Sequence, residues 1–326
     1  MTIQQLRTVC EIVRRRFNMS SAAAALHRSQ PALSRQIAGL EDELGVRIFS
    51  RSRNKIVGLT AHGEEIFAIG QRMTREADAL RQIGSDKGDV TSELRIATTH
   101  THARYALPWV IKHFTEAWPQ VLLNLRQGNP AQCFQLIAGG EADLGITVEV
   151  ERIPRDIVTI PIFKLARCVL APQGHAIGRG KLTLQRIAGY PIIAYTQAPD
   201  WKWLFGGVFA EADLAPRVVL SALDADVSKM YVSMGIGIAV LATITHDPAE
   251  DSNLIAIDAD HLFRPGILTL VLRKRAYITR HMHAFLAAFC PHLDPEFIQQ
   301  CVEGERFDRN QLLKKLPLTK HFKEHY

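Results

Sequence analysis

Residues 20–53 constrain the fold of this chain more than any other stretch, because signals for two helices and a tight turn follow one another closely. Residues 20–26 form an alanine-rich run that favours a short helix. Ser29 is a good N-cap and proline is tolerated only in a first helical turn, so Pro31 places the start of a second helix near Gln30. One apolar face and a terminating glycine complete this second helix: Leu33, Ile37, Leu40 and Leu44, then Gly45.

The opposite side of the second helix carries groups suited to reading DNA. Its first two turns present Gln30, Pro31, Ser34 and Arg35. Amide, hydroxyl and guanidinium groups recognise base edges in the major groove. A helix that enters the groove by its N-terminal end, behind a short first helix, has helix-turn-helix geometry. On pattern alone, an ordinary amphipathic helical hairpin remains the alternative.

The distribution of charge favours the DNA-binding interpretation over the plain hairpin. Residues 1–58 contain ten basic and four acidic side chains, a net charge of +6. The whole chain also has a formal net charge of +6, so the remainder is neutral. An excess of positive charge confined to one end is expected of a module that contacts phosphates.

The segments that flank the two helices extend this predicted surface. A preceding helix over residues 4–17 ends in three arginines, which either complement the helix dipole or contact the DNA backbone. Residues 46–49 and 56–57 bracket a basic loop and predict a β-hairpin wing. Its cations, Arg51, Arg53 and Lys55, would reach the sugar-phosphate edge or the minor groove.

A long helix and a hinge separate this module from the rest of the chain. Thr60 caps a helix over residues 61–83 whose apolar stripe has no other predicted element to cover it, which favours pairing with a second copy. A polar, glycine-bearing hinge follows at residues 84–89. The expected domains are a DNA-binding domain, a linker with its hinge, an effector-binding domain and a tail, at residues 1–59, 60–90, 91–291 and 292–326.

The pattern beyond the hinge alternates short apolar strands with helices, which predicts a parallel, doubly wound α/β sheet. A second set of such elements predicts two lobes, the first at about 91–162 and 267–291 and the second at about 163–266. Ligands bind such sheets beyond the carboxyl ends of the strands. The tail contains an expected helix over residues 297–302, and its lysine-rich end is expected to be mobile.

The sharpest local signal of a ligand is the run of threonines and histidines at residues 98–102, between a predicted strand and its helix. Hydroxyls and free backbone N–H groups there would form an anion site, to which Thr147 at the end of another strand would contribute. The alternative is that one threonine merely caps the helix. His100 and His102 would lie on one side of an extended segment, which suggests a metal site, but the sequence offers no third ligand.

Other classes of protein find little support in the sequence. No phosphate-binding glycine loop and no catalytic motif is present, so we expect neither an enzyme nor a cofactor. The N-terminus lacks a signal-like apolar core, and no apolar run reaches the length of a membrane span. The five cysteines are scattered, which suits reduced thiols. We therefore expect a cytoplasmic protein that does not associate with membranes.

These residues resemble the LysR-type transcriptional regulators along nearly the whole chain. The resemblance rests on the block SQPALSRQI at 29–37 and on spaced residues after it: Leu40-Glu41, Leu44-Gly45, Phe49, Arg51, Leu59-Thr60 and Gly63. Within the family, three segments are similar to the CysB-like branch, which governs the cysteine regulon and sulfur assimilation. They are ATTHTHARYALP at 97–108, DADV at 224–227 and GIG at 235–237.

The resemblance implies an N-terminal, all-α winged helix-turn-helix, a long linker helix and a two-lobed α/β effector domain like a periplasmic binding protein. It also implies a homotetramer, assembled as a dimer of dimers, that binds double-stranded operator DNA and usually activates transcription through RNA polymerase. The implied effector is a small sulfur metabolite, such as a sulfate-like anion or an acylated serine, bound between the lobes.

Carried over position by position, the effector site implied by the branch comprises Thr99, Thr101 and Thr147, with His102 where a glutamine is usual. This chain departs from the pattern at two further positions: Leu165 stands where a tryptophan is usual, and Asp200 stands where a threonine is usual. A carboxylate repels an anion, so a cationic or zwitterionic sulfur compound is an alternative to sulfate.

Three other functions remain open on the sequence. One is a LysR-type regulator of another pathway with a non-sulfur effector. Another is a small-molecule binding module whose helical end does not read DNA. The third is a two-lobed α/β enzyme, which would require a catalytic pair in the cleft that the sequence does not show.

Overall fold

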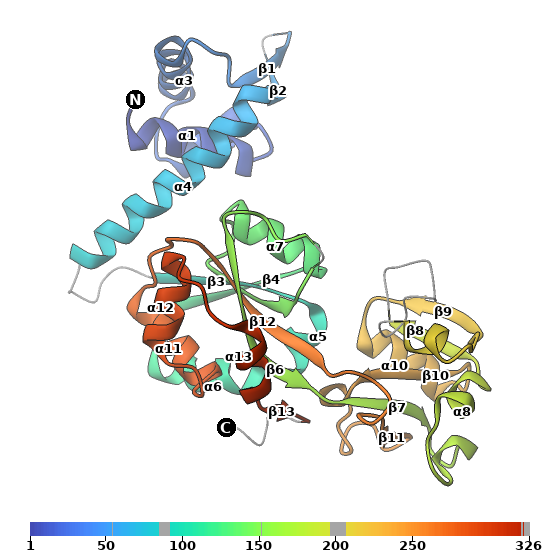
Figure 1. The fold of residues 1–326 in the computed structure, drawn as a ribbon. Helices are drawn as coiled ribbons and strands as arrows, with labels where there is room; N and C mark the ends of the chain where they lie inside the picture. The colour runs from blue at the N-terminus through green and yellow to red at the C-terminus, as the bar shows by residue number, and fades with distance from the viewer. Residues whose placement is uncertain (54, 85–91, 151, 196–206, 321, 323–326) are drawn as a thin grey trace. The chain divides into compact units, whose positions relative to one another are not determined.

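The computed structural model describes residues 1–53, 55–84, 92–150, 152–195, 207–320 and 322. The chain forms two compact units, Met1–Thr91 and Ser92–Tyr326 (Figure 1). Within the described ranges, none of the helices combines the length and the apolar character that crossing a lipid bilayer requires.

The first unit is a small helical domain with a two-stranded wing. Its elements in chain order are α1 (Ile3–Arg14), α2 (Met19–Ala25), α3 (Gln30–Leu44), β1 (Phe49–Ser52), β2 (Lys55–Leu59) and α4 (Ala61–Gly84). Side-chain caps start the first three helices: Thr2, Asn18 and Ser29 each accept a hydrogen bond from a backbone N–H three residues later. Gly45 ends α3 at φ +67°, a conformation that favours glycine. The helix-turn-helix and wing predicted from the sequence are therefore present.

The first half of α4 packs against its own domain, contrary to the expectation that no element of the chain covers its stripe. Ile66, Phe67 and Met73 lie partly buried against the core of the unit. Gly70 faces Leu6 of α1 so closely that a Cβ atom there would lie 3.4 Å from the leucine side chain. Farther along, Leu80 is 69% exposed. Only part of the predicted stripe is therefore available to a second copy.

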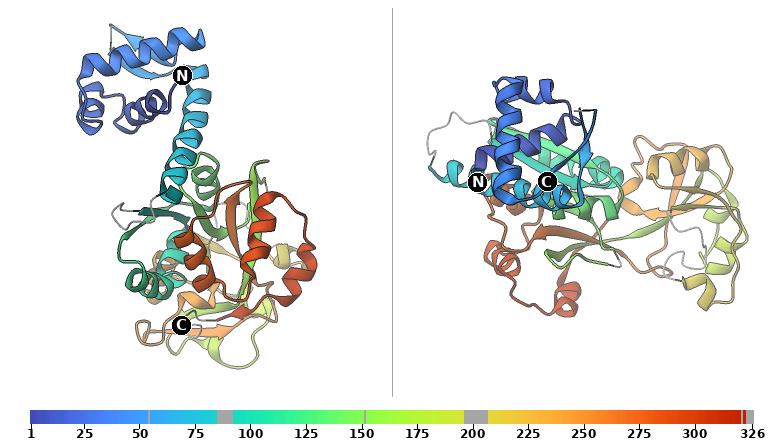
Figure 2. Two further views of the ribbon diagram at one scale, coloured as in Figure 1. Left: turned by 90° about the vertical axis from the view of Figure 1, so that its left-hand side faces the viewer. Right: turned by 90° about the horizontal axis from the view of Figure 1, so that it is seen from above.

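The second unit consists of two α/β lobes that lie side by side in Figure 1 and in the right-hand view of Figure 2. Lobe I contains β3 (Ser92–Thr98), α5 (His100–Tyr105), α6 (Pro108–Ala117), β4 (Val121–Gln127), α7 (Pro130–Ala138), β5 (Leu144–Val148), β6 (Ile157–Leu165), β12 (Gly266–Arg273), α11 (Arg280–Phe289), α12 (Pro295–Glu303), α13 (Arg309–Lys315) and β13 (Leu318–Thr319). Lobe II contains β7 (Arg167–Pro172), η1 (Ala176–Gly178), α8 (Leu184–Ala188), β8 (Ile192–Tyr195), α9 (Val208–Glu211), β9 (Val218–Ala222), α10 (Ala225–Ser233), β10 (Ile238–Ala242), η3 (Thr243–Thr245) and β11 (Leu254–Asp258).

Both sheets are mixed, whereas the sequence predicted parallel ones. The order in lobe I is β13-β6-β12-β5-β3-β4, and in lobe II it is β11-β7-β10-β8-β9. The parallel prediction is correct for β4-β3-β5 and for β10-β8-β9. It is wrong for β12, which runs antiparallel to β5 and β6, and for β7, which runs antiparallel to β10 and β11. These antiparallel strands adjoin the two places where the chain crosses between lobes, at Ala166 and at residues 259–265.

The alternating pattern predicts one helix over residues 103–118 after the first strand of the second unit, whereas the structure has two, α5 and α6. Pro108 lacks a backbone N–H and cannot continue α5, so α6 begins at this residue. The division leaves α5 only six residues long.

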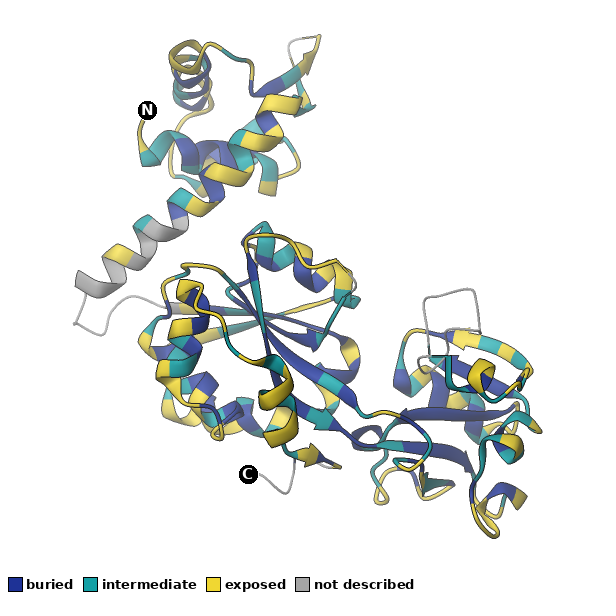
Figure 3. Cartoon of the chain, viewed as in Figure 1, coloured by how far each residue is buried: buried dark blue, intermediate teal, exposed yellow. Residues whose placement is uncertain are grey.

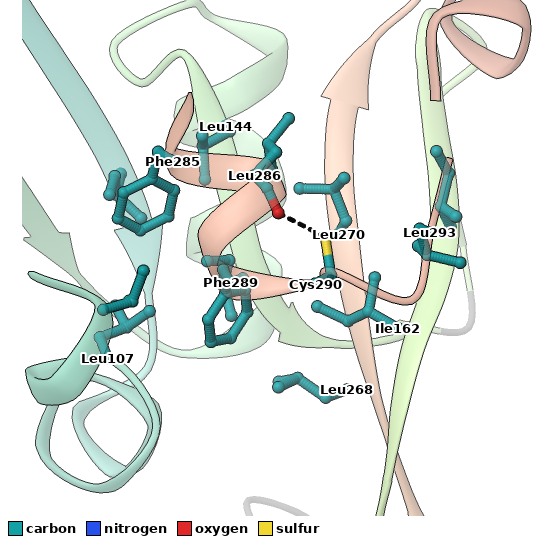
Figure 4. Close-up of a cluster of buried hydrophobic side chains, with 14 of the residues drawn as sticks. Leu107, Leu144, Ile162, Leu268, Leu270, Phe285, Leu286, Phe289, Cys290 and Leu293 are labelled. Atoms are coloured by element: carbon teal, nitrogen blue, oxygen red, sulfur yellow. Dashed lines mark hydrogen bonds between the residues drawn. The ribbon is translucent and has the colours of Figure 1, made fainter. Parts of the chain in front are cut away.

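The core of lobe I lies between its sheet and α11, as the buried residues in Figure 3 and the close-up in Figure 4 show. Phe285 and Phe289 of α11 pack with Leu268 and Leu270 of β12. Cys290 is buried at the end of this helix, and its thiol donates to the Leu286 carbonyl at 3.1 Å. The lobe is thus held by close apolar packing beneath the strands that lead to the crossovers.

The C-terminal tail is ordered on lobe I through residue 320, so the expectation of a mobile end is wrong for this part. Its short strand β13 pairs in parallel with β6. Leu316, Thr319 and Phe322 are buried, and the Phe322 ring centroid lies 5.0 Å from that of Phe163. Leu316 and Phe322 dock the tail, because both side chains are buried against the lobe.

Replacing Phe322 by alanine should lower the free energy of unfolding of the second unit by about 3–5 kcal/mol, because it removes a fully buried aromatic side chain. The four tryptophans all lie in this unit, so urea unfolding followed by tryptophan fluorescence measures the effect. Leu318→Ala is the matched control in the same tail, since Leu318 is 47% exposed. Equal stability of the two variants would show that the tail is not part of the core.

Candidate functional site

The N-terminal turns of α3 present the predicted reading groups on the surface of the first unit. Gln30, Pro31, Ser34 and Arg35 are all exposed. The Ser20 hydroxyl of α2 donates to the Gln30 side-chain oxygen at 3.0 Å, which ties the two helices of the motif together. The structure therefore brings these four side chains together on one end of one helix.

The wing differs in detail from its prediction, because its cations lie on the strands as well as in the turn. Arg51 belongs to β1 and Lys55 to β2, and both are exposed. Arg53 occupies the turn with a φ of +45°. A register irregularity between Ser50 and Arg51 interrupts the pairing of the two strands. These three cations thus form a second positive segment of the same unit.

A buried carboxylate joins α3 to the wing, and the sequence analysis did not identify it as a site residue. The side chain of Glu41 is 1% exposed. One oxygen accepts from the backbone N–H groups of Ile48 at 2.8 Å and Phe49 at 3.2 Å. The other faces Arg47 at 3.0 Å and Arg51 at 3.5 Å. In the sequence Glu41 begins a run of three acidic residues, 41–43, and nothing local distinguishes it from the exposed Asp42 and Glu43.

The ionised form of Glu41 is favoured despite its burial. Burial by itself raises the pKa of a carboxyl group, but the two backbone N–H groups and the two arginines outweigh it, so the pKa of Glu41 lies below its ordinary value. The carboxylate therefore acts as a fixed anchor that sets the position of β1 relative to α3.

In the second unit, a cavity of about 1350 Å³ lies between the lobes. The predicted residues Thr99, Thr101, His102 and Leu165 line it. Thr147 does not appear among the described lining residues, because its side chain is fully buried. Asp200, the sixth predicted effector residue, lies outside the described residues.

The hydroxyls of Thr99 and Thr101, two of the predicted effector residues, have different hydrogen-bond partners. Thr99 caps α5 and faces the His102 Nδ1 at 2.9 Å. Thr101 reaches across the cavity, where its hydroxyl lies 2.9 Å from that of Tyr195 in lobe II. A hydroxyl pair uses one proton internally and leaves the other for a ligand. Tyr195 was missed because its partner is 94 residues away in the sequence.

His102 is held in its neutral form. Burial lowers its pKa, the nearby positive charge of Arg167 lowers it further, and a hydrogen bond to the Ile146 backbone opposes them only in part, giving a pKa of about 4. The metal alternative assumed an extended segment, but His100 and His102 lie on α5, where His100 is exposed and His102 is buried. Among the described residues, no group of three or more His, Cys, Asp or Glu side chains is placed to hold a metal ion.

A polar cluster connects α5 to lobe II beside the cavity. Lys229 of α10 is 6% exposed and donates to the Tyr105 hydroxyl at 3.0 Å and to the Thr245 carbonyl at 2.9 Å. Its ammonium group also pairs with Asp251 at 2.7 Å. The Tyr105 hydroxyl donates in turn to Asp226. This network, in which Lys229 and Asp251 are buried, fixes the helix that carries Thr101 and His102 against the second lobe.

Models of two protein families match the chain. The helix-turn-helix family of bacterial regulatory proteins, lysR family, matches residues 3–64, and the LysR substrate binding domain matches residues 87–293. The HTH-type transcriptional regulator SsuR of Burkholderia cenocepacia is 45% identical over 297 residues, which cover 90% of this chain and 96% of that protein. The regulator CysB of Haemophilus influenzae is 36% identical over 318 residues, 97% of each chain.

A solved structure agrees with these relatives. The crystal structure of the cofactor-binding domain of the Cbl transcriptional regulator has a TM-score of 0.61 and 37% sequence identity. It covers 67% of this chain and 96% of that chain. The similarity therefore includes most of the second unit, where the cavity lies.

Replacing Glu41 by glutamine should destabilise the first unit by about 1.5–3 kcal/mol, because it removes hydrogen bonds to a buried charge. Amide hydrogen exchange at residues 48 and 49 should accelerate accordingly. Because the folded pKa is lowered, this stabilisation is present above the ordinary value of 4.5 and is lost as the pH falls through the folded pKa. Asp42→Asn, at the next and exposed position, is the control. Unchanged exchange in Glu41→Gln would contradict the anchoring role.

His102 should make the second unit less stable in mild acid. The folded pKa of about 4 lies below the ordinary 6.5, so the unfolded chain binds a proton first. Stability contributed by neutral His102 is complete above pH 6.5 and falls by about 3 kcal/mol as the pH drops to 4. Urea unfolding at several pH values should show a shallower pH dependence for His102→Gln than for the parent, with exposed His100→Gln as the control. Parallel curves for His102→Gln and the parent would refute the assignment.

Proposed function

This chain belongs to the LysR family of bacterial transcriptional regulators, and we propose that it controls genes of sulfur assimilation, cysteine biosynthesis or sulfonate use. It binds DNA through the first unit, and a small effector bound in the cavity of the second unit regulates it. The DNA-binding role is supported above all by the exposed N-terminal turns of α3, which Glu41 links by hydrogen bonds to the basic wing.

The proposed docking places α3 in the major groove by its N-terminal turns. Gln30, Ser34 and Arg35 would contact base edges, and Pro31 would pack against the adjacent groove wall. Arg51 and Arg53 of the wing would contact the sugar-phosphate backbone. The exposure of all these side chains and the +6 charge of residues 1–58 support this arrangement.

The proposed assembly is a homotetramer that acts as a dimer of dimers in the cytoplasm. Exposed apolar residues on the described part of α4, Ile69 and Leu80, support pairing of this helix with its copy. Effector binding would change the angle between the DNA-binding pairs and thereby the contact with RNA polymerase. Activation is the expected direction of this change.

The proposed effector site comprises Thr99, Thr101, His102 and Leu165, which line the cavity, together with Thr147 and Asp200. The sulfur assignment is supported by the CysB-like segment at residues 97–108, which supplies α5 and its preceding turn. The relation to CysB along 97% of this chain also supports it.

The reading helix and the sulfur role can be tested in one DNA-binding experiment. The purified protein should bind promoter fragments of its host's sulfur-assimilation or sulfonate-use genes more tightly than unrelated promoters, with an affinity that falls steeply with salt. Arg35→Ala and Gln30→Ala should each cost about 1–3 kcal/mol, roughly 5- to 150-fold in affinity, without changing oligomer size. Lys112→Ala removes one exposed charge from the second unit and is the matched control.

The outcomes of this experiment separate the parts of the proposal. Parental affinity in both variants would mean that α3 does not dock as described. Binding that is insensitive to salt would favour the small-molecule binding module over the DNA reader. Equal binding to sulfur-gene and unrelated promoters would reject the sulfur assignment and leave a LysR-type regulator of another pathway.

A further inference from the structure

An arginine whose Nε lacks an acceptor among the described residues lies in the wall of the inter-lobe cavity. Arg167 opens β7 directly after the first crossover, and its side chain lines the cavity. Its Nε is buried and has no hydrogen-bond partner in the described part of the chain. A buried N–H group of a guanidinium that lacks an acceptor is unfavourable unless a counter-charge reaches it.

The surrounding backbone holds the guanidinium in this position. The backbone N–H of Arg167 donates to the Asp260 carboxylate at 2.6 Å, so this acid is engaged by the main chain. The Arg167 carbonyl accepts from the N–H of Ala259 at 2.9 Å. At Gly266 a Cβ atom would lie only 2.9 Å from a terminal nitrogen of the guanidinium. The second crossover therefore fixes the main chain of Arg167, and a glycine leaves room for its side chain.

Burial dominates the electrostatics of this residue. It lowers the pKa of the Arg167 guanidinium below the ordinary value, although Cys168, Tyr195 and Asp260 act in the opposite direction. The group remains charged, since the guanidinium of an arginine does not lose its proton in proteins. An anion that entered the cavity would remove this unfavourable state.

The other charged groups on the described cavity wall leave a positive excess. Glu149 is ion-paired with Arg309 of α13, at 2.5 Å. Arg152 is positive and exposed at the wall. His102 is neutral near pH 7, because its pKa is about 4. The described wall thus favours a negative ligand, opposite in sign to the cationic effector that Asp200 suggested.

We propose that Arg167 is the counter-charge for an organic oxyanion, of the sulfonate or sulfate-ester type, bound in the inter-lobe cavity. The proposal rests on the proposed function, in which this cavity holds the effector. The hydroxyl pair of Thr101 and Tyr195 supplies a further donor to the oxyanion, and both residues line the same cavity. Tyr195 lies close enough to Arg167 for the two groups to influence each other's pKa.

The apolar residues of the cavity wall favour an anion that carries an alkyl group. Leu165 precedes Arg167 by two residues, and Ala242 pairs with Arg167 across the sheet of lobe II. Both line the cavity, together with Leu241. A cavity of about 1350 Å³ is also far larger than an inorganic oxyanion. The oxyanion would lie at Arg167 and its alkyl group against these side chains.

The test is calorimetric titration of the full-length protein with sodium 1-butanesulfonate, with sodium sulfate and butylammonium chloride as comparison ligands, at constant ionic strength. The parent should bind butanesulfonate more tightly than sulfate and should not bind butylammonium. Arg167→Gln should raise the dissociation constant for butanesulfonate about 10- to 100-fold, because it removes a charge-assisted hydrogen bond. Lys112→Gln removes an exposed positive charge outside the cavity lining and should change it less than threefold.

A second variant tests the same group without removing its charge, and it can be used if Arg167→Gln does not fold. Gly266→Ala places a methyl group against the guanidinium and should weaken binding of butanesulfonate by at least threefold while the circular dichroism spectrum stays unchanged. Parental affinity in Arg167→Gln, no binding of either anion by the parent, or preference for butylammonium would each overturn the proposal. The DNA-binding experiment with promoter fragments tests the regulator assignment independently of these titrations. A failure of the ligand proposal and a failure of the proposed function can therefore be distinguished.

Discussion

The backbone hydrogen bonds at the lobe crossovers determine where the ligand-facing groups of the second unit lie. The carbonyl of Ala166 accepts from Thr243 at 2.8 Å, and its N–H donates to Thr319 of the tail at 3.2 Å. The carbonyl of Arg167 accepts from Ala259 at 2.9 Å. Both crossovers and the tail are thereby joined at one point between the lobes. Leu165 and Arg167, on either side of Ala166, are consequently fixed on the wall of the cavity.

The first unit is organised around a buried charge in a comparable way, but there the charge is satisfied. Glu41 has two backbone donors and two arginines around it, so its pKa falls and the carboxylate is a stable structural anchor. Arg167 is only partly exposed, and its Nε has no acceptor in the described part of the chain, so desolvation prevails and its pKa is lowered as well. The lowered pKa of a carboxyl group means a favoured charge, whereas that of a guanidinium means a disfavoured one. The contrast distinguishes a charge that holds the fold from one for which we propose an anionic ligand.

Local signals accounted for the elements that were predicted well. A serine cap, a proline in the first turn and a glycine at the end define α3 within a residue of its observed bounds, because each signal acts on its own backbone. Pairing between distant segments was predicted poorly. The antiparallel placement of β12 between β5 and β6 depends on where the crossover enters the sheet. The docking of β13 depends on a strand more than 150 residues earlier in the chain.

The same distinction between local and distant interactions applies to the candidate sites. The sequence by itself determined the reading face of α3, the basic wing and the threonine-rich turn before α5, since residues close in sequence form each of them. Only the tertiary structure decided that Glu41 anchors the wing, that Tyr195 meets Thr101, that Thr147 is buried within the sheet and that Arg167 lines the cavity. The physical reason is that burial and hydrogen-bond satisfaction depend on neighbours brought together by the fold, and these determine whether a polar side chain supports the structure or faces a ligand.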